Sequence, residues 1–176
     1  MNFSFDPASY GPEVQAILAL DGSGGRLLPL TRGACSCAAA RDALKATTAR
    51  VLFPQSRAPE AALSGLYLYF SCWDDAHQVA QELDTPEGSY WHALVHRQEP
   101  DDGNSAYWFR HVGRHPIYPR LAAAANLPRW DPMAFLEVCA QARREPGSDG
   151  ERRARELQRL EWQMLFDYCA AKPEPV

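Results

Sequence analysis

The longest regular pattern of apolar residues begins at Pro59, and it constrains the fold more than any other feature of the chain. Apolar side chains recur there every three or four residues: Leu63, Leu66, Tyr67, Phe70 and Trp73, followed by His77. This spacing places them on one face of an α-helix, and Pro59 suits its first turn. We therefore expect one helix over residues 59–83 at the centre of the core. Residues 66–70 have the composition of a strand, but their context favours the helix.

Shorter segments with helical spacing lie before and after this one. Ser148 followed by Glu151 is typical of a helix start, and Gly113 is typical of a helix end. No strand alternation and no internal repeat are evident. Apart from a short helix at 12–20, the expected helices cover residues 34–47, 59–83, 89–98, 105–112, an alanine-rich segment ending near 126, 132–144 and 149–170. The sequence predicts an all-α fold: one compact domain over 1–176 with about seven helices, an irregular lead-in at 1–33 and a frayed tail at 172–176.

Composition narrows the class of protein and its location. The 176 residues fit one domain, and a formal net charge of −4 gives no reason to expect binding to nucleic acid. No apolar run reaches the roughly 18 residues of a membrane-spanning helix, and residues 1–7 lack the pattern of a secretion signal. The odd number of scattered cysteines favours reduced thiols in a cytoplasmic protein. Cys35 and Cys37 have the spacing of a chelating pair, but no second pair or nearby histidine completes a site.

Four of the five histidines fall in one short segment, as two pairs spaced by four residues: His92 with His96, and His111 with His115. Imidazoles at this spacing on a helix can bind one metal ion. Ala93 stands where a metalloprotease motif needs glutamate, so only the ligand pair remains. His77 lies on the apolar face of the 59–83 helix, where it needs a hydrogen-bond partner or a metal. The alternative is that these imidazoles are structural and bonded to backbone or carboxylate groups.

A turn at 101–104 separates the helices expected at 89–98 and 105–112. We expect the two to pack antiparallel as a central αα-hairpin, which would bring the second histidine pair near the first. The predicted ligands of a divalent Zn, Mn or Fe ion are His77, His92, His96 and His115.

Aromatic and charged residues of the same hairpin suit a small anionic ligand, held by forked guanidinium bonds and aromatic stacking. The predicted binding residues are Trp91, Arg97, Glu99, Asn104, Tyr107, Trp108, Arg110, His111 and Arg114. In the alternative interpretation the aromatic residues are core. Arg97 would then pair with Glu99, and Arg110 and Arg114 with the acids at 101–102.

The string GSYWHAxxHRxEPDxxNxxYWFRxVGxHP, which runs from Gly88 to Pro116, resembles the signature of an uncharacterised protein family from bacteria and fungi. The family has no assigned activity. The resemblance implies only that its members share this hairpin.

Three functions remain open from the sequence. The first is a metal-dependent enzyme, in which the ion activates water or binds oxygen. The second is a small-molecule binding protein or an enzyme without metal, in which His92 or His96 acts as general base. The third is a non-catalytic interaction protein, in which the hairpin is structural and the helices at 59–83 and 149–170 form a homodimer.

Overall fold

The computed structural model describes residues 3–173, and all regular structure within this range is helical. In chain order the α-helices are α1 (Pro12–Ala19), α2 (Ala38–Lys45), α3 (Ala49–Leu52), α4 (Pro59–Tyr69), α5 (Trp73–Gln81), α6 (Pro86–Gln98), α7 (Asp102–Val112), α8 (Ile117–Ala125), α9 (Pro132–Arg144) and α10 (Asp149–Ala170), with short 3-10 helices η1 (Pro7–Tyr10) and η2 (Gly22–Gly24). The all-α prediction is confirmed for these residues. Of the predicted frayed tail, residues 174–176 lie outside the described range. None of the helices described is both long and apolar enough to cross a lipid bilayer.

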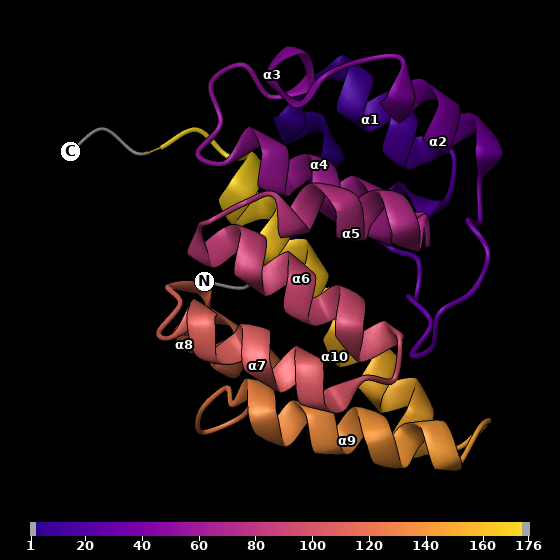
Figure 1. The fold of residues 1–176 in the computed structure, drawn as a ribbon, viewed down its shortest axis with the longest axis vertical. Helices are drawn as coiled ribbons and strands as arrows, with labels where there is room; N and C mark the ends of the chain where they lie inside the picture. Colours follow the sequence, from indigo (N-terminus) through magenta and orange to yellow (C-terminus); the bar gives the residue numbers. More distant parts are fainter. Residues whose placement is uncertain (1–2, 174–176) are drawn as a thin grey trace.

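The longest helix, α10, is the element on which much of the core is assembled. Figure 1 shows it in yellow, passing behind α6 and α4. It packs on α4, α8 and α9. Trp162 at its middle is fully buried and donates its indole N–H to the carbonyl of Gly65 in α4 at 2.8 Å. The Ser148 side chain accepts a hydrogen bond from the backbone N–H of Glu151, as the cap pattern predicts.

The predicted single helix over 59–83 is wrong. It is divided into α4 and α5 by a turn at residues 70–72. Cys72 N–H donates to the Tyr67 carbonyl and Ser71 N–H to the Leu68 carbonyl, the pair of bonds that closes a Schellman motif. Ser71 occupies the left-handed position of this motif, with φ of 57°. Glycine or asparagine is the usual residue at such a position. Because serine occupies it here, the break could not be recognised from the sequence.

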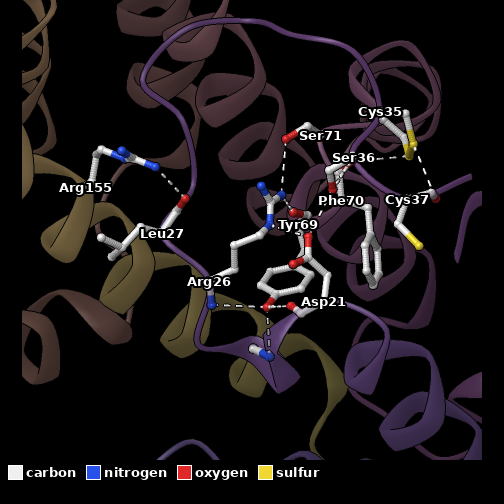
Figure 2. Close-up of polar contacts among 12 residues, drawn as sticks. Asp21, Arg26, Leu27, Cys35, Ser36, Cys37, Tyr69, Phe70, Ser71 and Arg155 are labelled. Carbon is white, nitrogen blue, oxygen red and sulfur yellow. Dashed lines mark hydrogen bonds and ion pairs between the residues drawn. A yellow bond between two sulfur atoms is a disulfide. The ribbon is translucent and has the colours of Figure 1, made fainter. Parts of the chain in front are cut away.

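Hydrogen bonds from the segment between η2 and α2 stabilise this turn. The Arg26 guanidinium donates to the Tyr69 carbonyl, and the Ser36 N–H donates to the Phe70 carbonyl at 2.7 Å (Figure 2). In an uninterrupted helix those carbonyls would accept from residues four positions later. The break therefore depends on residues more than thirty positions away, which no local pattern reveals.

The predicted helix count of about seven is too low for the described residues, because α3 was also not predicted. The helix expected at 34–47 forms only α2, and α3 follows it, with Thr48 as its side-chain cap. Two other helices begin one turn before their predicted starts. Thr85 caps α6 and Asp101 caps α7.

The expectation of reduced thiols is wrong for two of the cysteines. Cys35 and Cys72 are joined by a disulfide, with Cα atoms 4.2 Å apart. The bond spans 37 positions of sequence, so spacing alone could not identify the pair. Cys37, Cys139 and Cys169 are free.

Candidate metal centre

Three histidines from two helices converge on one point. His77 comes from α5, and His92 and His96 from successive turns of α6. One ring nitrogen of each lies within 4.8 Å of those of the other two. His77 Nε2 and His92 Nε2 are 3.0 Å apart. Two imidazoles bound to one tetrahedral zinc ion, with Zn–N bonds of about 2.0–2.1 Å, hold their nitrogens about 3.3 Å apart. The observed 3.0 Å is the length of a hydrogen bond between the two rings, and a shared ion would require their nitrogens to separate by only about 0.3 Å.

The position of α6 explains why its histidines are buried. It packs against α5 on one side and α7 on the other, and its residues from Gly88 to Gln98 are all buried. His92 and His96 lie one turn apart with their rings stacked at 4.8 Å. The His77 ring stands nearly perpendicular to both.

Two tryptophans form the walls of the centre. Trp73, the first residue of α5, stacks on His77 with ring centroids 5.0 Å apart and donates its indole N–H to the Val95 carbonyl at 2.8 Å. Trp108 of α7 stacks on His92 at 4.0 Å. These contacts fix the planes of two of the three imidazoles.

The electrostatics keep His77 and His92 neutral. Burial, followed by the neighbouring His77 and His96, lowers the pKa of His92 to about 3. The pKa of His77 is also lowered, first by burial and then by His96. A neutral imidazole is the form that binds a metal. At neutral pH, His77 and His92 therefore need not lose a proton before they coordinate an ion.

Oxygen donors lie at the exposed side of the centre. Glu99 Oε2 is 3.1 Å from His96 Nδ1, and Asp101 lies close enough to form a second group with these two residues. The Asn104 side-chain nitrogen is 3.2 Å from His96 Nε2. The Glu99 side chain is 36% exposed, so this side of the centre meets solvent.

Arg32 is a residue of the site that the sequence did not indicate. Its guanidinium lies 4.1 Å above the Trp73 ring, donates to Asp74 at 2.8 Å and is 3.8 Å from Glu99. Arg32 belongs to a segment without periodicity, and Trp73 was assigned only to the core. Helical spacing places Trp73 one turn before His77, but no sequence signal marks Arg32 as a neighbour of the histidines.

The structure does not bring His115 to this centre. Gly113 ends α7, and His115 is buried among Tyr90, Tyr118 and Tyr168 instead. His111 is exposed, with its Nδ1 3.0 Å from the Tyr107 carbonyl.

Two of the predicted binding residues are core. Trp91 is fully buried against Gly65. Arg97 is also fully buried and pairs with Glu161 at 2.6 Å, rather than with an external anion or with Glu99. The predicted pairing of Arg110 and Arg114 with the acids at 101–102 is replaced by a contact between Arg143 and Asp102.

The Arg143 guanidinium and the Asp102 carboxylate are 2.8 Å apart. Arg110, Arg114 and Tyr107 are exposed on or beyond α7. Of the predicted ligand-binding set, Glu99, Asn104 and Trp108 therefore contact the histidine cluster.

Comparison with protein-family models, with curated proteins and with solved structures gave no match to this chain. The resemblance of residues 88–116 to a family signature stays a prediction from the sequence.

Proposed function

We propose that this protein binds one divalent transition-metal ion through His77, His92 and His96, with Glu99 orienting the His96 ring through its Nδ1. The observation that carries the proposal is the convergence of three imidazoles, with one ring nitrogen of each within 4.8 Å of those of the other two. Placing three histidines together in a partly buried site without an ion or a full set of hydrogen bonds is costly.

The type of ligand atom indicates which metal ions the site would favour. Imidazole nitrogens suit Zn²⁺ and Fe²⁺, whereas Mn²⁺ favours carboxylate and water ligands. We therefore expect Zn²⁺ or Fe²⁺ rather than Mn²⁺. Three histidines leave a fourth position open for water, and a zinc-bound water would have a pKa near 7. Hydrolysis is accordingly the reaction class to assay first.

Elemental analysis of protein purified without an affinity tag tests the proposal. We expect about one Zn²⁺ or Fe²⁺ per chain, as in a three-histidine site, and its loss in the double variant His92→Ala/His96→Ala. His77→Gln is a milder variant, since His77 is only half-buried and its loss leaves the α6 core intact.

His111→Ala is the matched control, because His111 is exposed and outside the cluster. It should retain the metal. Added metal at about a hundred times its Kd should raise the free energy of unfolding by about 2.7 kcal/mol in the wild type. Wild-type protein without metal, and without stabilisation by added Zn²⁺ or Fe²⁺, would refute the proposal.

A small anion is the second candidate ligand, and one observation favours it. The Arg32 guanidinium stands beside Glu99 at the exposed side of the centre. The Arg32 side chain is 42% exposed and pairs at the surface with Asp74, so an anion can reach it, whereas Arg97 is buried. Phosphate or oxalate should then stabilise metal-loaded wild type more than Arg32→Ala, measured by thermal unfolding.

A further inference from the structure

The disulfide lies next to the metal centre along the chain. Cys72 directly precedes Trp73, the residue that stacks on His77. Cys35 lies three positions after Arg32, whose guanidinium covers the same tryptophan. The bond therefore joins two segments that both contact one wall of the site.

The turn between α4 and α5, which carries Cys72, adopts an unfavourable backbone conformation. Ser71 has φ of 57°, a value that costs a residue with a side chain about 1 kcal/mol or more. Figure 2 shows the contacts that hold it: Arg26 reaches Ser71 Oγ at 3.2 Å, and the Ser36 hydroxyl donates to the Phe70 carbonyl at 3.0 Å. The disulfide is the covalent member of this set.

Trp73 transmits the position of the turn to the ligands. Its ring stacks on His77 in α5, and its indole N–H binds the Val95 carbonyl between His92 and His96 in α6. A shift of the first turn of α5 would therefore change the distance between the ligand of α5 and those of α6.

We propose that the Cys35–Cys72 disulfide is a redox control of the metal centre, such that its reduction weakens metal binding. This inference rests on the proposed function. Without the bond, the strained turn can relax, and Trp73 and Arg32 lose their fixed positions. Groups that orient metal ligands typically contribute roughly 10–100-fold to affinity, so we expect the Kd for Zn²⁺ to rise about tenfold.

The reducing partner is a dithiol. Its thiolate attacks Cys35, which is the more exposed sulfur, since Cys72 is buried. A mixed disulfide forms and the Cys72 thiolate leaves and takes up a proton. The second thiol of the partner then displaces Cys35, so that both protein sulfurs end as thiols and the partner ends as a disulfide.

The test compares the Zn²⁺ affinity of oxidised and reduced protein by competition with a chromophoric chelator. Reduced protein is prepared with dithiothreitol. The dithiothreitol is then removed, because it binds zinc itself, and air is excluded so that the protein thiols stay reduced. We expect the Kd to rise about tenfold on reduction and to return on reoxidation. Cys35→Ser/Cys72→Ser should reproduce the reduced value without adding thiol ligands. Cys37→Ser, which keeps the disulfide, is the matched control and should behave as the oxidised wild type.

Equal Kd values for oxidised and reduced wild type would overturn this inference and leave the proposed function intact. Loss of the helical circular dichroism signal on reduction would also overturn it, because the bond would then support the whole fold rather than the site. Absence of zinc binding by the oxidised protein would refute both proposals together.

Discussion

At the scale of single residues, His115 shows what burial does to an imidazole that binds no partner of opposite charge. It lies among Tyr90, Tyr118 and Tyr168, and its Nε2 is buried without a hydrogen-bond partner among the described residues. Burial lowers its pKa to about 4. The folded protein therefore holds this group neutral where an unfolded chain would protonate it.

This difference predicts acid sensitivity. As the pH falls below about 6.5, the unfolded state gains a proton at His115 while the folded state does not gain one until about pH 4. The free energy of unfolding should fall through this window, by up to about 1.4 kcal/mol per pH unit from this one group. His115→Phe removes the group with little change in shape.

Urea unfolding between pH 7.5 and 4, with a chelator present, measures the effect. The free energy of unfolding of the variant, relative to that of the wild type, should rise as the pH falls, by about 3 kcal/mol between pH 7.5 and pH 4. Parallel stability curves for the two proteins would contradict the assignment.

The buried ion pair of Arg97 gives a second prediction. Glu161 accepts from Arg97 at 2.6 Å and from the Tyr90 hydroxyl at 2.8 Å, with both charged groups out of solvent. Glu161→Ala would leave a buried guanidinium without its counter-ion, which should cost about 3–5 kcal/mol. Chemical denaturation measures this loss.

Asp149→Ala is the control, because Asp149 pairs with Arg152 at the surface. It should cost less than about 1 kcal/mol. Similar losses in the two variants would mean that the buried pair contributes no more than a surface pair.

Sequence reasoning found the three clustered histidines for a local reason. Helical periodicity brings His92 over His96 whatever the tertiary fold, and it places His77 on a buried face. Arg32 could not be found, because it reaches the site only through the tertiary path of an irregular segment. His115 was assigned to the centre because the expected antiparallel hairpin would have brought the second histidine pair near the first.

At the scale of elements, the approach of α4 to α6 depends on one glycine. A Cβ at Gly65 would lie 2.7 Å from the ring of Trp91, which is fully buried and has no space to move. Gly65→Ala should therefore destabilise the protein by about 1–3 kcal/mol through overpacking, as measured by denaturant unfolding.

Gly103→Ala in α7 is expected to have the opposite effect on stability. The nearest atom to its added Cβ is 3.7 Å away, and the backbone is helical. Alanine there should stabilise by up to about 1 kcal/mol through its higher helix propensity. If both substitutions stabilise, α4 and α6 do not pack as closely as described.

Cap chemistry explains which helix boundaries the sequence could predict. Asp131 and Ser148 mark the starts of α9 and α10, and their side chains accept the expected backbone hydrogen bonds. The break at Ser71 was missed because it depends on tertiary contacts to Tyr69 and Phe70 rather than on a residue type that favours a turn.

At the scale of the whole molecule, α10 joins the two ends of the described chain. Gln163 donates to the Gly24 carbonyl at 2.8 Å, and Gln158 donates to the Pro29 carbonyl at 2.9 Å. Tyr10 donates to Asp167 at 2.9 Å. Local patterns predicted the helix and its apolar face, but they could not indicate that its polar side chains bind a segment some 130 positions earlier.

Removal of α10 should therefore abolish cooperative folding of the rest. A fragment of residues 1–147 loses the partner of its N-terminal segment and exposes the core that Trp162 and Phe166 cover. Circular dichroism with thermal unfolding should show no cooperative transition. A peptide of residues 148–171 added in trans should restore one, and the same peptide with Trp162→Ala should restore much less, since a buried tryptophan is worth about 3–5 kcal/mol. A cooperative transition in the fragment alone would contradict this role of α10.

The same connection sets an order of events during synthesis. Leu28 accepts from Arg155, which the ribosome adds 127 residues later. At about 5–20 residues per second, this delay is roughly 6–25 s. Throughout that interval the segment around Leu28 lacks the helix that covers it in the folded protein.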